Sequence, residues 1–120
     1  MKPESAAQLT QKKCKPCEGG VDACSLAEAQ SQLGHLAGWR LTHEGQRIRK
    51  DWKMKDFAAA LAFFNQVAAI AEAEDHHPDL HLESYRQVWI EIWTHAIGGL
   101  SENDFILAAK IDAIPVELKA

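Results

Sequence analysis

The chain has 120 residues, of which 47% are hydrophobic and 25% are charged, and its formal net charge is -4. These values are typical of a single globular domain, because domains hold about 100 to 200 residues and disordered chains are poorer in apolar side chains. The acidic balance argues against nucleic-acid binding, which needs a basic surface to neutralise phosphates. No apolar stretch approaches the length of about 20 residues that a membrane span needs, so neither nucleic acid nor a membrane is an expected partner.

Residues 1–24 are polar and contain Cys14-Lys-Pro-Cys17 followed by two glycines. This composition predicts a loop-rich N-terminal arm ahead of a domain that spans residues 25–120. The first residues lack the apolar core of a signal peptide, so a cytoplasmic location is expected. Cys14, Cys17 and Cys24 leave three roles open: a zinc site completed by a histidine, a redox pair, or free thiols. Free thiols are favoured, because a structural zinc site usually uses two close pairs of ligands.

The first predicted helix begins at Ser25, which can cap it together with Glu28 in a capping box. Residues 39–43 alternate as a strand does, and residues 46–52 return as a second strand after a hairpin turn at Glu44-Gly45. Asp56 can cap the next helix, in which apolar side chains recur at intervals of three and four over residues 57–71.

The long helix is followed by His76-His77-Pro78. Because the residue before a proline is disfavoured in the helical conformation, the helix is predicted to end near these histidines. Residues 80–85 and 87–94 alternate as two further strands, and Ser101 opens a last helix that Pro115 ends. The predicted fold is α+β: a single four-stranded antiparallel sheet with three helices packed on one face, in the order α-β-β-α-β-β-α.

Three histidines of the domain, His76, His77 and His95, are candidates for proton transfer. Imidazole has an unperturbed pKa of about 6.5, which lets it give and accept protons near neutrality. The usual zinc-binding helix spaces two histidines one turn apart with a glutamate between them, and this chain lacks that pattern. The alternative is an exposed helix end with polar side chains.

Several short motifs, in a fixed order, extend this hypothesis over residues 26–111. They are Gly38-Trp39, Phe63-Phe64-Asn65-Gln66-Val67-Ala68, Glu72-Ala-Glu-Asp75-His76-His77-Pro78, Tyr85-x-x-Val88, Thr94-His95 and Gly99-Leu100-Ser101-Glu102-Asn103-Asp104. With this ordered set the chain resembles the pterin-4a-carbinolamine dehydratases, also called 4a-hydroxytetrahydrobiopterin dehydratases.

The resemblance implies a hydro-lyase that removes water from 4a-hydroxytetrahydropterin and yields quinonoid dihydropterin, with neither a metal nor a cofactor. It implies that His76 and His95 transfer protons and that His77 orients the pterin. The positions that it implies for substrate binding are Glu72, Trp39, Pro78, Thr94 and Asp104. Asn103 stands where the animal branch of the family carries arginine, and this departure bears on substrate preference.

The resemblance also implies partners. The reaction would recycle the pterin cofactor of an aromatic amino acid hydroxylase, and the chain is expected to form a homodimer or homotetramer. Two alternatives remain at this stage: a non-dehydrating pterin-binding protein linked to molybdopterin metabolism, and a protein-interaction role as a dimerisation cofactor.

Overall fold

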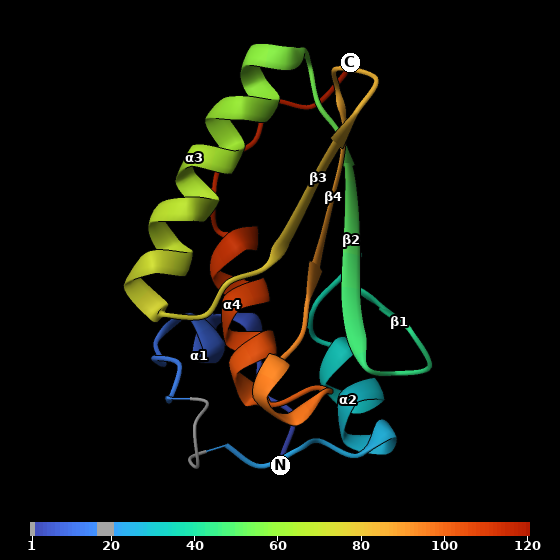
Figure 1. Ribbon diagram of the computed structural model, residues 1–120, viewed down its shortest axis with the longest axis vertical. Coiled ribbons are helices and arrows are strands. Elements are labelled where there is room, and N and C mark those ends of the chain that lie inside the picture. Colours follow the sequence, from blue (N-terminus) through green and yellow to red (C-terminus); the bar gives the residue numbers. More distant parts are fainter. Residues whose placement is uncertain (1, 17–20) are drawn as a thin grey trace.

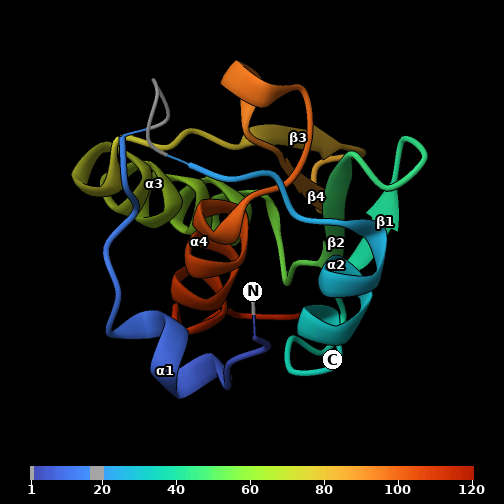
Figure 2. The same ribbon diagram turned by 90° about the horizontal axis from the view of Figure 1, so that it is seen from below.

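The computed structural model describes residues 2–16 and 21–120 and has the α+β fold predicted from the sequence (Figure 1). One antiparallel sheet has the strand order β1-β2-β4-β3, with β1 (Arg40–Thr42), β2 (Arg47–Lys53), β3 (Asp79–Glu83) and β4 (Gln87–Ile92). The helices are α1 (Ala6–Thr10), α2 (Leu26–Leu33), α3 (Phe57–Glu74) and α4 (Glu102–Asp112), with a short 3-10 helix, η1 (His95–Ile97). Helices α3 and α4 lie on the same side of the sheet, which confirms the predicted layers (Figure 2).

Both hairpins turn through pairs of residues in the left-handed backbone region. His43 and Glu44 have φ of 53° and 57°, and Ser84 and Tyr85 have φ of 49° and 53°. Two such residues in succession form the type of turn whose twist matches that of the flanking strands. Strand β3 therefore ends at Glu83, two residues earlier than the alternation of side chains predicted.

The register of β2 on β4 decides which side chains enter the core. Ile48 pairs with Ile92 and Trp52 pairs with Val88, so that these four side chains share the face that the helices cover. Helix α4 lies between this face, α3 and α1, and its side chains are buried on nearly every side (Figure 2). Because α4 is enclosed in this way, it lacks the one-sided apolar pattern of a surface helix.

The prediction of a loop-rich arm over residues 1–24 was incomplete, because this segment contains α1. Ser5 and Gln8 close its N-terminal end as a capping box, and Leu9 is completely buried against the core. Gln32 binds both the backbone N–H and the carbonyl of Glu4, at 2.9 Å and 2.8 Å. A helix of five residues with one buried side chain is too short to show a periodic pattern in the sequence.

Candidate active site

The end of α3 gives the two neighbouring histidines opposite environments. Asp75 adopts the left-handed conformation, with φ of 51°, and the N–H of His76 then donates to the carbonyl of Ala71 at 3.2 Å. The helix thus closes before Pro78, and the chain changes direction at the histidine pair. The side chain of His76 is only 5% exposed, whereas that of His77 is 55% exposed.

The ring of His76 is held by a buried carboxylate. Its Nε2 lies 2.7 Å from Oδ1 of Asp104, which is completely buried. Because an ionised carboxylate only accepts hydrogen bonds, this contact assigns the proton of the neutral ring to Nε2. The pair therefore fixes both the orientation and the tautomer of His76.

The second oxygen of Asp104 is held from the opposite side. Oδ2 accepts hydrogen bonds from the Thr94 hydroxyl and from the backbone N–H of Ser101, each at 2.8 Å. The hydroxyls of Thr94 and Ser101 also lie 2.8 Å apart. A chain of hydrogen bonds thus runs from Ser101 and Thr94 through Asp104 to His76, and we call these four residues the buried relay.

Thr94 and Asp104 were expected to bind substrate, but the structure places both behind His76. Their side chains have no exposed surface, so that neither faces the solvent from which a substrate would arrive. Their expected role in substrate binding stays a prediction. The structure shows that Ser101 and Asp104 also form the capping box of α4, and nothing in the sequence indicated that the same carboxylate holds a histidine.

His77 lies with Glu72 at the edge of a surface cavity. Its Nε2 is 2.6 Å from Oε2 of Glu72, and both side chains are exposed. The cavity has a volume of about 280 Å³ and is lined by Val67, Ala68, Ala71, Glu72, His77, Pro78 and Leu80. The small side chains of α3 leave a flat apolar wall, and the histidine and the glutamate supply polar groups beside it.

The third candidate histidine, His95, is exposed and follows Thr94 of the buried relay in the chain. It begins η1 directly after Thr94, and its ring lies against Trp93 with the two centroids 4.3 Å apart. The indole N–H of Trp93 donates to Asp79, which follows Pro78, at 3.1 Å. The structure therefore links His95 to His76 through Thr94 and Asp104, and to the His77 segment through Trp93 and Asp79.

A tight loop fixes the start of η1. The N–H of Thr94 donates to the carbonyl of Gly99 at 2.8 Å, and Gly98 adopts the left-handed conformation with φ of 60°. The end of α3, the start of β3 and η1 all lie toward the lower end of the molecule in Figure 1.

Trp39 lies apart from these histidines. It is buried, its indole N–H donates to Asp112 at 2.9 Å, and its ring meets Trp52 edge to face. Asp112 is eight residues beyond Asp104 on α4, a separation of about 12 Å along the helix axis. The ring of Trp39 is packed within the core, and its expected place beside the substrate stays a prediction.

The cysteines that the structure describes have the properties of unreactive thiols. Burial, together with the nearby Glu74 carboxylate, raises the pKa of Cys14 to about 12. Burial, with Glu28 nearby, raises the pKa of Cys24 to about 11. Cys17 lies outside the described residues, and within residues 2–16 and 21–120 no three metal-ligating side chains form a group that could hold a metal ion.

In the described part of the chain, the helices are all too short or too polar to cross a membrane.

Comparisons with known proteins agree with this architecture. Residues 22–114 match the family model described as pterin 4 alpha carbinolamine dehydratase. The mitochondrial pterin-4-alpha-carbinolamine dehydratase 2 of Arabidopsis thaliana is 51% identical over 94% of the chain, which spans 62% of that protein. A putative pterin-4-alpha-carbinolamine dehydratase of Halorhodospira halophila is 46% identical, over 88% of this chain and 96% of its own length.

A solved structure resembles the fold as well. The crystal structure of a transcriptional coactivator/pterin dehydratase from Brucella melitensis superimposes with a TM-score of 0.71 at 33% identity, covering 77% of this chain and 97% of that one. The family model and the full-length bacterial relative cover the same sheet and histidine segments described above. The chain therefore belongs to the pterin 4 alpha carbinolamine dehydratase family.

Proposed function

We propose that this protein converts 4a-hydroxytetrahydropterin to quinonoid dihydropterin and water by histidine acid-base catalysis. The observation that carries the proposal is the buried hydrogen bond between His76 and Asp104, at 2.7 Å. A histidine paired with a fully buried carboxylate has a fixed ring and a defined proton position, which proton transfer requires. Family membership supplies the substrate class.

In the proposed reaction, the bond between C4a and its hydroxyl breaks as an acid delivers a proton to the leaving oxygen. A base removes the proton from N5, and the electron pair of that N–H bond forms the new double bond between N5 and C4a. Water is the only other product, so the step needs no oxidant or reductant. His76 and His95 share the roles of acid and base, since each reaches the region from a different segment.

The cavity beside His77 is the proposed seat of the pterin ring. Its apolar wall on α3 suits a flat bicyclic ring, and the hydrogen bond to Glu72 holds the His77 imidazole at the edge of that wall. Pro78 lines the same cavity and fixes the backbone there. In this proposal His77 and Glu72 orient the pterin, while Asp104, Thr94 and Ser101 position His76 from behind.

The metabolic role of the reaction and its location in the cell are also proposals. The product would return to a reductase, and the pterin would serve an aromatic amino acid hydroxylase, as the resemblance implies. The cytoplasmic location expected from the sequence stays a prediction, and the Arabidopsis relative carries the word mitochondrial in its name.

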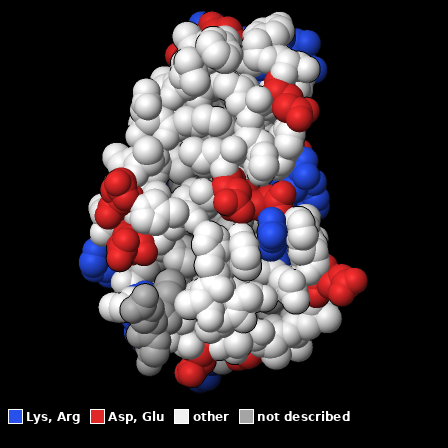
Figure 3. All heavy atoms as spheres, in the orientation of Figure 1, with Lys and Arg blue, Asp and Glu red and all other residues white. Residues whose placement is uncertain are grey.

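Self-association is proposed through α3. Phe57 and Leu61 of this helix, and Leu80 of β3, are large apolar side chains that remain exposed. In the space-filling view few charged side chains lie over the middle of α3 (Figure 3). Burial of such side chains against a second copy would be favourable, because each apolar side chain removed from water contributes about 1.5–3 kcal/mol.

A second function is suggested by the name of one structural relative. The Brucella protein is described as a transcriptional coactivator as well as a pterin dehydratase. A protein-interaction role, or pterin binding without dehydration, would leave the fold intact but would not require the buried relay.

The test is a dehydration assay with freshly generated 4a-hydroxytetrahydropterin. We expect His76→Ala and His95→Ala each to lower kcat by about a hundredfold or more, because general acid-base groups contribute about 10²–10⁴-fold. His35→Ala is the matched control, since His35 is exposed in the loop after α2 and should retain full activity. Full activity in His76→Ala would refute the proposed mechanism, and pterin binding by an inactive wild-type protein would favour the non-dehydrating role.

A further inference from the structure

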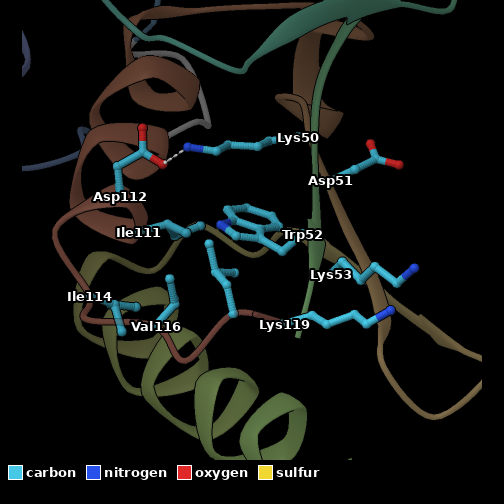
Figure 4. A pocket seen from close by; sticks show the side chains of 10 residues that line it. Lys50, Asp51, Trp52, Lys53, Ile111, Asp112, Ile114, Val116 and Lys119 are labelled. Carbon is cyan, nitrogen blue, oxygen red and sulfur yellow. Dashed lines mark hydrogen bonds and ion pairs between the residues drawn. The ribbon is translucent and has the colours of Figure 1, made fainter. Parts of the chain in front are cut away.

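The outward face of the sheet carries side chains that the proposed mechanism does not yet use. Along β2, Asp51 and Lys53 extend away from the helices, whereas Trp52 extends toward α4 (Figure 4). Because side chains alternate along a strand, Arg47 and Arg49 lie on the same outward face as Asp51. These arginines meet aromatic side chains that belong to β4 and to the residue directly after it.

Trp93 follows the last residue of β4, and its ring contacts two side chains. The guanidinium carbon of Arg47 lies 4.5 Å from the ring centroid, and the imidazole centroid of His95 lies 4.3 Å from it, with an angle of 51° between the two ring planes. A guanidinium over an indole is attracted by the π electrons of the ring, so Arg47 helps to hold the indole in place. The indole thus forms a wall beside the exposed imidazole of His95.

Two carboxylates restrict the position of Arg47. A guanidinium nitrogen lies 3.6 Å from Oε2 of Glu91 and 3.9 Å from Oδ2 of Asp79. The side chain of Glu91 is only 9% exposed, and a carboxylate buried to this degree needs a counter-charge nearby. The guanidinium is therefore held over Trp93 by charge as well as by the ring.

Asp79 fixes the orientation of the indole. Its Oδ2 accepts a hydrogen bond from the N–H of Trp93 at 3.1 Å. Asp79 pairs with Glu91 in the register of β3 on β4, so Trp93, two residues beyond Glu91, is its diagonal neighbour on the same face. Since Asp79 follows Pro78 in the chain, this bond joins the chain around Trp93 to the segment that begins with His77.

The three candidate histidines are thus held in different ways. His76 and His77 each lie within hydrogen-bond distance of a carboxylate, whereas His95 lies against an aromatic ring. His95 also begins a 3-10 helix of three residues, an element too short to restrict its side chains by itself. Contact with a ring that is itself fixed therefore decides where this imidazole lies.

We propose that Trp93 is a positioning residue for His95. This inference rests on the proposed function, in which His95 transfers a proton. Through its bond to Asp79, Trp93 holds the imidazole at a fixed place relative to the His77 segment, and loss of that bond lets the indole and the imidazole move together. A displacement of about 1 Å can lower the rate of a reaction about a hundredfold, so a smaller displacement should lower it about tenfold.

The test is a double-mutant cycle in the dehydration assay. We expect Trp93→Phe, which keeps a ring but has no N–H, and Asp79→Ala each to lower kcat about tenfold and to leave KM within about twofold. Because both changes remove the same hydrogen bond, the double variant should be no slower than either single one. Asp79→Asn keeps a side-chain oxygen as the acceptor and should retain kcat within about twofold of wild type.

Two further comparisons separate positioning from packing alone. In a His95→Ala background, Trp93→Phe should have no further effect on kcat, because the side chain that it positions is absent. Trp89→Phe is the matched control, since Trp89 lies on the same outward face with Arg49 over its ring at 4.8 Å and His81 stacked on it at 4.9 Å. This variant should retain full kcat, because His81 has no part in the proposed reaction.

A ¹H–¹³C NMR spectrum of the imidazoles tests the contact itself, without reference to activity. The ring current of the Trp93 indole should displace the His95 signals, assigned with His95→Ala, from their positions in the denatured protein. Asp79→Ala should move these signals back toward the denatured positions, whereas Trp89→Phe should leave them unchanged. The dispersion of the amide resonances checks that each variant is folded.

The outcomes distinguish this inference from the proposed function. If the protein is active and requires His95, the inference is overturned when Trp93→Phe and Asp79→Ala keep full kcat, when their effects add, or when Trp93→Phe slows the His95→Ala variant about tenfold further. His95 signals that do not respond to Asp79→Ala would also overturn it. A wild-type protein without dehydratase activity, or full activity in His95→Ala, would refute the proposed function and the inference with it.

Discussion

At the residue scale, we propose that Asp104 acts by holding His76 in position. Its carboxylate bonds His76 on one side and Thr94 and Ser101 on the other, and it has no exposed surface. Replacement by asparagine keeps the shape but offers an amide in place of two anionic oxygens. The proton position on His76 is then no longer dictated by a carboxylate.

We therefore predict that Asp104→Asn lowers kcat by about tenfold or more and leaves KM within about twofold, because the carboxylate has no exposed surface and is hydrogen-bonded to His76. Steady-state kinetics on 4a-hydroxytetrahydropterin measure both constants, and a thermal melt checks the fold. A rise in KM at unchanged kcat would instead mean that Asp104 contributes to binding.

Cys14 gives a second residue-scale prediction, on chemical reactivity. Burial raises the pKa of this thiol to about 12 from an ordinary value of 9.0. At pH 8 the thiolate fraction should therefore be on the order of a thousandfold lower than that of a free cysteine, and it should increase about tenfold per pH unit up to the pKa.

In a Cys17→Ser background, Cys14 should resist iodoacetamide in the native state and react at the ordinary rate in denaturant. Mass spectrometry of timed samples follows the modification at each cysteine. Native alkylation of Cys14 as fast as that of a small thiol would contradict the burial seen here.

At the element scale, Glu74 joins three segments. It accepts a hydrogen bond from the N–H of Cys14 and one from the ammonium of Lys110, each at 2.8 Å, and thereby connects α3 to the N-terminal segment and to α4. Burial alone would raise the pKa of this carboxyl, but the hydrogen bonds from Lys110 and Cys14 outweigh it and lower the pKa below 4.5.

Because the folded-state pKa of Glu74 is lowered, its contribution to stability is present above the unfolded pKa and is lost as the pH falls through the folded pKa. We predict that Glu74→Gln lowers the free energy of unfolding by about 1–2 kcal/mol at pH 7. The difference from wild type should shrink below about pH 4, where the carboxyl takes up its proton. Urea unfolding at a series of pH values measures this difference in the free energy of unfolding. A difference that does not depend on pH would show that the negative charge of Glu74 is not its cause.

The elements differ in how much the sequence reveals of them. Helix α3 was predicted because its apolar side chains recur at helical intervals, and β4 because its buried and outward side chains alternate. Helix α1 was missed because a single buried leucine carries its packing. Asn103 shows the same limit: its side chain binds both the N–H and the carbonyl of Lys15, a contact 88 residues away in sequence that no local pattern indicates.

At the scale of the whole molecule, the sequence identified His76, His77 and His95 as candidates, but it did not indicate the side chains that each of them contacts. The turn at Pro78 and the Thr94-His95 pair marked the segments that meet. The buried relay forms because α4 is enclosed by the sheet and two helices. The burial of Trp39, which donates to Asp112 on α4, has the same cause. Such burial is a property of tertiary packing, which residue type and spacing alone do not determine.

The exposed apolar side chains of α3 lead to the last prediction, on assembly. Leu61 is 42% exposed in the second turn of α3 and is not part of the buried core of the isolated chain. If copies associate through α3, Leu61→Glu should place a charge in the interface and shift the protein to smaller species, while the fold is retained. Light scattering coupled to size-exclusion chromatography measures the mass. Leu26→Glu is the matched control, because Leu26 on α2 is 55% exposed and lies outside α3. Equal masses for wild type and Leu61→Glu, or dissociation caused equally by Leu26→Glu, would exclude α3 as the contact surface.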